Sequence, residues 1–382
     1  MDAACVQGRP DRAQGVDLLK PIAVVLTARP SYTKLKPILD HLEDFVIVSC
    51  ASANLVDYGE VALQAERDFP GKVRRVYSTL AGNTLQTTAK DAGVLLQSLA
   101  DVFADIDPAI VVVMADRYET LTASMAARYQ NIPVAHIQGG ERSGNVDDVV
   151  RDANSALAAY HFPATHLASL RVHSLTGSSH IYNYGCPSID IAKAALGDPP
   201  VTVEEIGGAG APLDFNQRFA IVLHHPETEQ PEQAFNQMRT VLDGVRQAGL
   251  PALIIWPGAD AGHDLTSKAI RVTILKHPEW STHTVRGVAP HRFLRLLSQA
   301  SVLVGNSSAG IREASYLGVP VVNVGERQRG RERAGNVLDC DYEDVCECLY
   351  RRGRYATSAL YGDGTAGERI AAKLAELRGG RV

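Results

Sequence analysis

The sequence predicts an α/β protein built of two Rossmann-like domains that face each other across a cleft. Short apolar runs alternate with stretches of helical periodicity along the chain, which is typical of doubly wound, mostly parallel sheets. Residues 195–215 are rich in Gly, Pro and Ala, and a second α/β series starts after them. A length of 382 residues leaves room for two domains, each with its own core. We therefore expect a disordered extension (1–18), two domains (19–198 and 199–365) and a C-terminal helix (366–382).

In the first half, candidate site residues follow three of the predicted strands. Strands are predicted at 22–27, 45–49, 110–114 and 133–137, and helices at 33–42, 84–103, 119–128 and 147–161. Arg29 comes after the first strand, Asp116 after the third and Glu141 after the fourth. Because the carboxyl ends of parallel strands meet at one edge of a sheet, we expect these side chains to gather there.

In the second half, the stretch 302–325 has the order strand, small-residue turn, short helix and strand. The predicted strands of this half are 219–223, 252–256, 302–304 and 319–324, and helices follow after about residue 342 and over 367–378. Asn306, Ser307 and Ser308 stand where the short helix begins, and they offer hydroxyls and N–H groups to a phosphate. Glu313, at about the second turn, could reach a ribose hydroxyl of a nucleotide bound there. The alternative is an ordinary capped helix.

A basic run follows this stretch, with four arginines in the seven residues 327–333. It is either a solvated loop or, beside a phosphate-binding turn, a charge-assisted clamp for an anion. His225, which follows the strand at 219–223, is a further phosphate-binding candidate, or else a loop histidine with ordinary partners.

The two halves therefore offer different chemistry. The second carries phosphate binders, whereas the first carries the carboxylates Asp116, Glu141, Asp147 and Asp148. This division suggests that one domain holds a nucleotide diphosphate while the other performs acid–base chemistry on the attached group. Two alternatives stay open: Asp147 or Asp148 as a helix N-cap, and Asp116 as the surface partner of Arg117.

The composition excludes several classes of protein. A net charge of −5 gives no global basicity for nucleic acid. No segment approaches the roughly 18–20 apolar residues of a membrane span, and residues 1–18 lack the apolar core of a signal peptide. The six cysteines are scattered without metal-ligand spacing, which indicates free thiols in a reducing cytoplasm. We expect a cytoplasmic enzyme without metal or cofactor that binds neither nucleic acid nor membranes.

With these motifs in view, the chain resembles the UDP-N-acetylglucosamine 2-epimerase family, and within it the hydrolysing branch that makes N-acetylmannosamine for sialic-acid-type sugars. The resemblance runs from about residue 22 to 345. It is carried by residues 115–119, by 136–148 with Arg151, by 225–228, and by 305–314 continuing into 325–328. Four such stretches in the same order are hard to obtain by chance.

The resemblance implies a GT-B-like pair of domains with UDP in the cleft, and a homo-oligomer, either a dimer or a tetramer. Arg29, Ser307 and Ser308 would contact the diphosphate, Glu313 the ribose, and His225 the diphosphate or the departing UDP. The other residues expected to bind the nucleotide sugar are Arg117, Arg151, Asn306, Gly310, Arg327 and Gln328. The acid–base set would be Asp116, Glu141 and Asp147 or Asp148.

The implied reaction removes the proton at C2 of the sugar and expels UDP from C1 by anti elimination, which leaves a 2-acetamidoglucal. Water then adds at C1 while C2 is protonated from the opposite face, so the products are UDP and the free 2-epimer.

The sequence also departs from the family pattern. Asp152, Ala156, Ala158 and Ala159 replace a histidine, a lysine and a Ser-His pair, Ala115 replaces a glycine, and 51–53 replaces a Gly-Met-His stretch. The first turn, 29–32, partly resembles the non-hydrolysing branch. We infer that polar groups are missing on the sugar side, so another UDP- or GDP-linked sugar is a possible substrate. Alternatives are a non-hydrolysing epimerase, a hydrolase or eliminase without C2 inversion, and a non-catalytic nucleotide-sugar binding protein.

Overall fold

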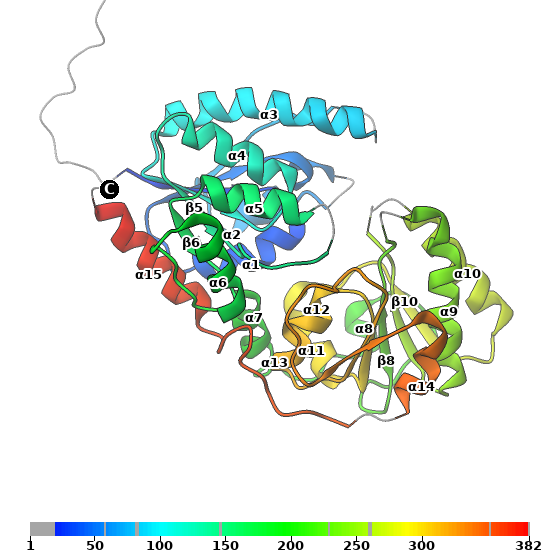
Figure 1. Ribbon diagram of the computed structural model, residues 1–382. Helices are drawn as coiled ribbons and strands as arrows, with labels where there is room; N and C mark the ends of the chain where they lie inside the picture. The colour runs from blue at the N-terminus through cyan, green and yellow to red at the C-terminus, as the bar shows by residue number, and fades with distance from the viewer. Residues whose placement is uncertain are drawn as a thin grey trace, which may run out of the picture.

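The computed structural model describes residues 20–56, 59–80, 84–144, 147–227, 230–258, 262–350 and 353–380. It contains two sheets, each flanked by helices, in two domains of the GT-B-like arrangement (Figure 1). The fold class predicted from the sequence is therefore confirmed. The extension predicted at 1–18 lies outside the described residues.

The first sheet has six strands in the order β3-β2-β1-β4-β5-β6, and its strand pairs are parallel. The strands are β1 (Ile22–Leu26), β2 (Phe45–Ser49), β3 (Val73–Arg75), β4 (Ile110–Met114), β5 (Val134–Ile137) and β6 (Tyr160–Phe162). The helices are α1 (Arg29–Leu39), α2 (Val61–Asp68), α3 (Leu85–Ile106), α4 (Tyr118–Arg128), α5 (Asp147–Leu157), α6 (His166–Thr176) and α7 (Ser188–Ala195). All five residues of β4 are buried because helices cover both faces of a central parallel strand.

The second sheet has seven strands in the order β13-β12-β11-β8-β9-β10-β7, parallel except for β7 against β10. The strands are β7 (Ala209–Gly210), β8 (Ala220–Leu223), β9 (Ala252–Ile255), β10 (Thr282–Val285), β11 (Val302–Gly305), β12 (Val321–Val324) and β13 (Val337–Cys340). The helices on this sheet are α8 (Val203–Ile206), α9 (Ala234–Gln247), α10 (His263–Lys276), α11 (Pro290–Gln299), α12 (Ser308–Ile311), α13 (Glu313–Tyr316) and α14 (Val345–Leu349). The last helix of the chain, α15 (Ala366–Gly379), packs on the first sheet instead.

The sequence predicted the bounds of strands with long apolar runs correctly, but it did not predict the short elements. The strands expected at 45–49 and 110–114 have these bounds in the structure. The helix expected at 147–161 is wrong at its end, because α5 stops at Leu157 and residues 160–162 form the three-residue strand β6. The single helix expected after Asn306 is two four-residue helices, α12 and α13, which meet at Arg312.

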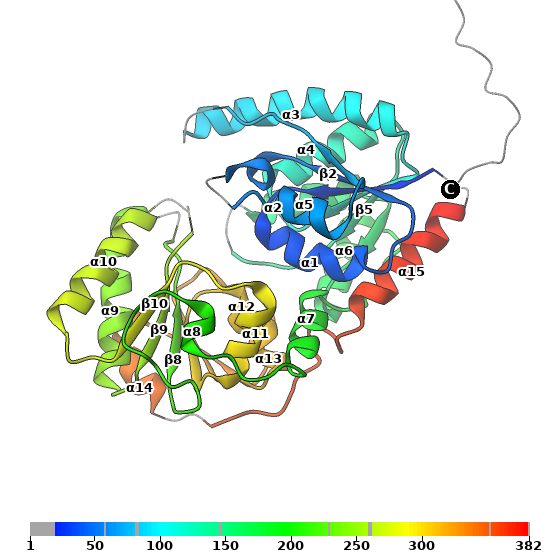
Figure 2. The same ribbon diagram turned by 180° about the vertical axis from the view of Figure 1, so that it is seen from behind.

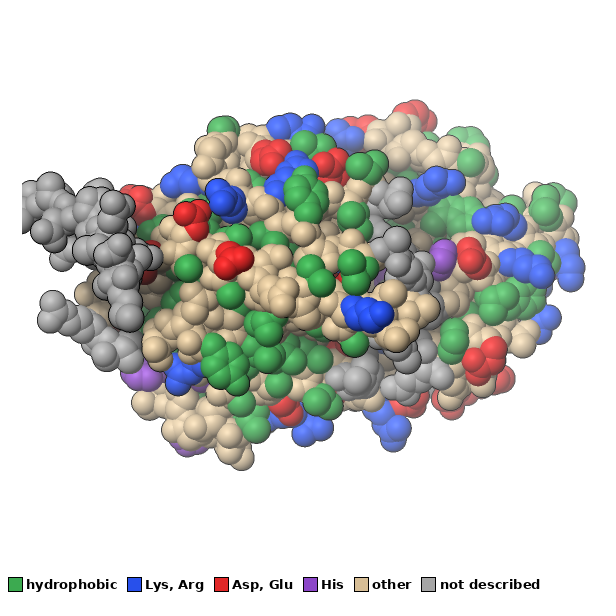
Figure 3. All heavy atoms as spheres, turned by 90° about the horizontal axis from the view of Figure 1, so that it is seen from above, with side chains coloured by type: hydrophobic (Ala, Val, Ile, Leu, Met, Phe, Trp, Pro, Cys, Tyr) green, Lys and Arg blue, Asp and Glu red, His purple; other side chains and the backbone are tan. Residues whose placement is uncertain are grey.

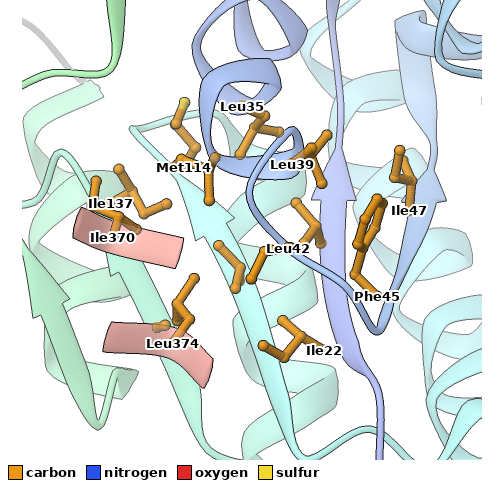
Figure 4. Close-up of a cluster of buried hydrophobic side chains, with 14 of the residues drawn as sticks. Ile22, Leu35, Leu39, Leu42, Phe45, Ile47, Met114, Ile137, Ile370 and Leu374 are labelled. Atoms are coloured by element: carbon orange, nitrogen blue, oxygen red, sulfur yellow. The ribbon is translucent and has the colours of Figure 1, made fainter. Parts of the chain in front are cut away.

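The C-terminal helix α15 returns to the first domain, and both ribbon views show it beside that domain (Figures 1 and 2). Ile370, Ala371 and Leu374 join the buried cluster that contains Ile22 and Leu35 (Figure 4). A Cβ at Gly367 would lie 2.5 Å from the carbonyl oxygen of Pro37, so a glycine is needed where α15 touches α1. The end of the chain therefore closes the core of its beginning.

The chain passes between the domains at two adjacent points. The N–H of Cys186 donates to the carbonyl oxygen of Tyr361 at 2.7 Å, and a Cβ at Gly185 would lie 2.6 Å from Cα of Gly362. The two connections are thus in backbone contact, and they fix where the domains join.

The distribution of surface charges and the hydrophobicity of the helices agree with the low net charge and globular composition of the sequence. On the face seen in Figure 3, acidic and basic side chains are interspersed rather than gathered by sign. No helix in the described part of the chain is both long and apolar enough to cross a membrane.

Replacing Leu374 should test the docking of α15. Leu374→Ala removes a fully buried side chain and should lower the free energy of unfolding by about 2–5 kcal/mol, measured by urea denaturation. The matched control is Leu275→Ala on α10, whose side chain is 81% exposed and whose loss should cost no more than about 0.5 kcal/mol. Equal effects of the two changes would show that α15 contributes nothing to the core.

Candidate active site

The predicted site residues lie at carboxyl ends of strands in both sheets. Asp116 follows β4, Glu141 follows β5, His225 follows β8, and Arg29 is the first residue of α1 after β1. Asp147 and Asp148 begin α5. Residues from both domains meet here, because Glu141 of the first domain contacts arginines of the second.

The guanidinium of Arg151 on α5 organises the carboxylates of the first domain. It is 1% exposed, and it contacts the carboxylate of Asp116, Oδ1 of Asp148 at 2.5 Å and the carbonyl oxygen of Glu141 at 2.8 Å. Burial alone would raise the pKa of Asp116, but the positive charges of Arg151, Arg331 and Lys34 hold that pKa below its usual value. Arg151 therefore holds the carboxylates rather than reaching for a substrate.

Asp148 ties the loop after β5 to the start of α5. Its Oδ1 accepts from N–H and Oγ of Ser143 at 2.8 and 2.9 Å, and its Oδ2 accepts from N–H of Gly144 at 2.9 Å. Burial alone would raise the pKa of Asp148, but these hydrogen bonds stabilise the ionised carboxylate and hold the pKa below its usual value. Both oxygens are occupied by groups that precede α5, so Asp148 ties the loop to the helix, which differs from the N-cap role left open by the sequence.

Asp147, in contrast, has an exposed side chain. Neighbouring protein atoms still displace part of the water around its carboxyl group, and this desolvation, followed by the negative charge of Asp116, raises its pKa. The pKa values of Asp116 and Asp147 are thus shifted in opposite directions, downward for Asp116 and upward for Asp147. Such a pair can divide acid and base roles between its members.

Glu141 links the domains through two ion pairs. Its Oε2 accepts from Nη2 of Arg312 at 2.5 Å and also contacts Nη1 of Arg331. Burial would raise the pKa of Glu141, but Arg312, Arg331 and Arg151 lower it to about 2. The carboxylate is therefore ionised, and it binds the two domains together.

On the side of the site formed by the second domain, the side chain of Asn306 holds the backbone of His225. Its Oδ1 accepts from the N–H of His225 at 2.8 Å, its Nδ2 donates to the carbonyl oxygen of His225 at 2.9 Å, and Nε2 of Gln328 donates to the carbonyl oxygen of Asn306 at 3.0 Å. Burial, and then the charge of Arg327, lower the pKa of His225 to about 3. The imidazole is consequently neutral near pH 7.

The serine turn depends on a glycine. Gly305 has φ +140°, and a Cβ there would lie 2.1 Å from the carbonyl oxygen of Leu223. Ser307 and Ser308 follow as half-buried hydroxyls. Because α12 has four residues, the helix-dipole contribution that the sequence predicted is small. Oγ of Ser307 accepts from the N–H of Ala309 at 3.3 Å, so Ser307 caps this short helix, and the serine hydroxyls are candidate phosphate ligands.

Glu313 offers a buried acceptor. It is 8% exposed, and among the described residues its Oε2 has no hydrogen-bond partner. A buried carboxylate oxygen of this kind is costly unless a ligand supplies a donor.

Arg117 and Gly310, both expected to bind the nucleotide sugar, contact other side chains of the protein. Asp116 pairs with Arg151, and Arg117 instead donates to both oxygens of Glu119, at 2.8 and 3.1 Å. Gly310 is buried, and a Cβ there would lie 2.9 Å from the side chain of Val321, so this glycine serves helix packing.

The basic run is not a clamp as a whole. Arg331 pairs with Glu141, Arg333 with Asp339, and the exposed Arg329 with Glu326. Arg327 is the member of the run whose charge acts on His225.

The inference that polar groups are missing on the sugar side stays a prediction, and the structure shows where the replaced residues near Arg151 lie. Asp152 pairs with Arg171 of α6 at 2.5 Å, Ala156 is exposed, and Ala158 and Ala159 pack against the hydrophobic clusters. The site face of α5 carries residues 148, 151 and 155, and a residue one position further along points about 100° away.

The sequence reasoning also missed two cations. Arg312, inside a motif that it had identified, contacts Glu141. Lys34 on α1 donates to Oε1 of Gln138 at 3.3 Å, and burial followed by the charge of Arg312 lowers its pKa. Lys34 lies within two turns of Arg29, but sequence alone could not choose between it and Lys36.

Comparisons with known proteins agree with this geometry. A family model described as UDP-N-acetylglucosamine 2-epimerase matches residues 43–375. A UDP-N,N'-diacetylbacillosamine 2-epimerase (hydrolyzing) of Legionella pneumophila is 30% identical over 92% of this chain and 94% of its own length. A UDP-N-acetylglucosamine 2-epimerase of Neisseria meningitidis is 26% identical over 92% and 94%, respectively.

Among solved structures, the UDP-GlcNAc 2-epimerase from Neisseria meningitidis bound to UDP-GlcNAc has a TM-score of 0.76 at 20% identity, over 93% of this chain and all of that one. The fold, the interdomain carboxylate and serine walls, and the match over most of the chain lead to one conclusion: the protein belongs to the UDP-N-acetylglucosamine 2-epimerase family.

Proposed function

We propose that the protein is a hydrolysing nucleotide-sugar 2-epimerase, which converts a UDP-linked 2-acetamido sugar and water into UDP and the free 2-epimer. The observation that carries the proposal is geometric: the buried Arg151 holds the carboxylate of Asp116 at the end of β4, and the ion pairs of Glu141 with Arg312 and Arg331 bring this edge of the sheet against the second domain. The printed name of the Legionella relative, a hydrolysing epimerase, supports the hydrolytic outcome.

The second domain would hold the nucleotide. The hydroxyls of Ser307 and Ser308 and the neutral His225 would bind the diphosphate together with Arg29, and the unpartnered oxygen of Glu313 would accept from the ribose. Charge develops on the β-phosphate as it leaves C1, so donors on this wall stabilise the transition state more than the ground state.

The first domain would move the protons. Asp116, held ionised by Arg151, suits removal of the C2 proton, whose electron pair forms the C1–C2 double bond as UDP departs with the C1–O electrons. Asp147, with its raised pKa, suits return of a proton to C2 while water adds its hydroxyl to C1. The remaining proton of that water recharges Asp147, and the proton that Asp116 took from C2 passes to solvent, so both carboxyl groups return to their starting states. Both arginines contact Oε2 of Glu141, so we assign this residue to holding the domains; its Oε1 has no hydrogen-bond partner among the described residues, and the acid–base role expected from the sequence stays a prediction.

A second candidate is non-hydrolysing epimerisation, in which UDP stays on the product. The first turn, which begins Arg29-Pro30, favours it.

Proton NMR in heavy water should identify the reaction. UDP-N-acetylglucosamine and UDP-N,N'-diacetylbacillosamine are supplied in turn, and at least one should yield free UDP and a 2-epimer deuterated at C2. Deuterium at C2 with UDP still attached would establish the second candidate. Free sugar without deuterium at C2 would reveal hydrolysis without epimerisation. Binding of the nucleotide sugar without turnover would indicate a non-catalytic protein.

Substitutions on the two walls should separate turnover from binding. Asp116→Asn should abolish turnover and leave UDP affinity, measured by calorimetry, unchanged. Ser307→Ala combined with Ser308→Ala should weaken UDP binding by about 1–3 kcal/mol, as expected for lost hydrogen bonds to a charged group. Loss of UDP binding in Asp116→Asn would show that Asp116 contacts the nucleotide, which would contradict its assignment to proton transfer.

The interdomain role of Glu141 predicts a pH-dependent stability. Its pKa of about 2 lies below the ~4.3 of an unfolded glutamate, so its contribution is present above about pH 4.3 and disappears as the pH falls towards 2. Wild type should be more stable than Glu141→Gln by about 3 kcal/mol at neutral pH, and urea denaturation should show this gap closing in acid.

The control for that experiment is Glu326→Gln, which removes the negative charge of a side chain that is 68% exposed and paired with the exposed Arg329. It should cost no more than about 1 kcal/mol, as surface ion pairs do. A gap for Glu141→Gln that stayed constant in acid would contradict the ion-pair role.

A further inference from the structure

A buried hydrogen-bond network lies directly behind Asp116. We propose that His136 is a positioning residue, which aims the carboxylate of Asp116 by holding the carbonyl group of Ala115. The proposal rests on the proposed function in one respect, the assignment of Asp116 to proton transfer.

His136 bridges a helix and the end of a strand. Its Nε2 lies 2.9 Å from the carbonyl oxygen of Ala115, and its Nδ1 lies 3.0 Å from Oγ of Ser155 on α5. A carbonyl oxygen only accepts, so Nε2 carries the proton, and Nδ1 accepts from the hydroxyl of Ser155. Both side chains are fully buried, so each of these atoms depends on the other for its partner.

The network continues into α4 through Asn154, the neighbour of Ser155. Nδ2 of Asn154 donates to Oγ1 of Thr120 at 2.8 Å and lies 3.4 Å from the same carbonyl oxygen of Ala115. Oδ1 of Asn154 accepts from Oγ of Ser124 at 2.7 Å. The bond from His136 is therefore the shorter of the two that fix this carbonyl.

The carbonyl needs fixing because the backbone there is strained. Ala115 has φ +65°, the left-handed conformation that a non-glycine residue keeps only when its surroundings enforce it. Its N–H donates to the carbonyl oxygen of Ile137 at 2.9 Å. With N–H and C=O of Ala115 both held by β5, the next residue, Asp116, has a defined direction.

Gly139 provides separate support for the contact between His136 and Ser155. A Cβ at Gly139 would lie 2.8 Å from Oγ of Ser155 and 2.9 Å from Nδ1 of His136. Any larger residue would push these two atoms apart, so the loop leaves room for their hydrogen bond.

The chain offers a matched control, His161. It is the register partner of His136 on the neighbouring strand β6 and is 1% exposed. Among the described residues its ring nitrogens have no hydrogen-bond partner, and it is not bonded to Ala115.

The experiment compares His136→Leu, His136→Gln and His161→Leu. His136→Leu should lower kcat about 100-fold, the cost of misplacing a reacting group, and leave the Kd of UDP unchanged. His136→Gln, which keeps an N–H donor at the position of Nε2, should recover most of the loss. His161→Leu should keep the wild-type kcat.

NMR supplies readouts that do not need turnover. Imidazole nitrogen shifts should show the Nε2–H tautomer of His136 in the wild type. The carboxyl carbon signal of Asp116, assigned by its loss in Asp116→Asn, should titrate at a different pH in His136→Leu and at the wild-type pH in His136→Gln and His161→Leu.

Equal behaviour of His136→Leu and His161→Leu in kcat and in the titration of Asp116 would overturn the proposal, as would the Nδ1–H tautomer. If His136→Leu does not fold, His136→Gln and Ser155→Ala provide the same comparison. A wild-type protein without turnover would refute the proposed function alone, because the titration of Asp116 would still test the positioning role.

Discussion

The buried guanidinium of Arg151 is the charge on which the rest of the site depends. Two carboxylates and a backbone carbonyl surround it, and each would be destabilising in the interior without it. These partners come from the end of β4, the loop after β5 and the first turn of α5. One buried cation therefore locks three separate segments into a single rigid wall, which suits a reaction that needs protonating groups at fixed positions.

A second set of charges joins that wall to the other domain. Glu141 lies in the loop that Arg151 and Asp148 hold, and it accepts from Arg312, which separates α12 from α13. Arg312 immediately precedes Glu313, the candidate ribose ligand. Contact between the domains and the arrangement of the nucleotide wall are consequently set by the same ion pair. In this arrangement, the proposed base Asp116 and the candidate ribose ligand Glu313, which lie far apart in sequence, are brought to opposite sides of one site.

The sequence predicted what depends on local pattern. Five-residue runs of buried apolar side chains, such as 110–114, have no competing interpretation in an α/β chain, so both sheets and the positions of Asp116 and Glu141 followed. Three-residue strands such as β6 are too short to show a period, and β6 was taken as the end of a helix. The partners of Glu141 lie 171 and 190 residues away, and no local pattern encodes such pairs.

The inference about the sugar side stays a prediction, because it counted replaced polar residues without asking which face of α5 they occupy. Residues 148, 151 and 155 share the face that meets the site, and Asp152 and Ala156 do not. The composition of a motif therefore predicts a site only after its helical face has been assigned.

Backbone conformation at the strand ends explains why these loops can carry the chemistry. Ala115, Gln138 and Gly305, at the ends of β4, β5 and β11, all have positive φ. A left-handed residue turns the chain sharply as it leaves a strand, so the side chains that follow point along the sheet edge instead of continuing its pleat. A glycine at such a turn signals itself in the sequence, whereas alanine and glutamine do not. Both of these non-glycine turns are held by buried hydrogen bonds, from His136 to the carbonyl of Ala115 and from the side chain of Gln138 to Cys186. The side chains that enforce the strained turns are therefore as much a part of the site as the carboxylates that those turns direct.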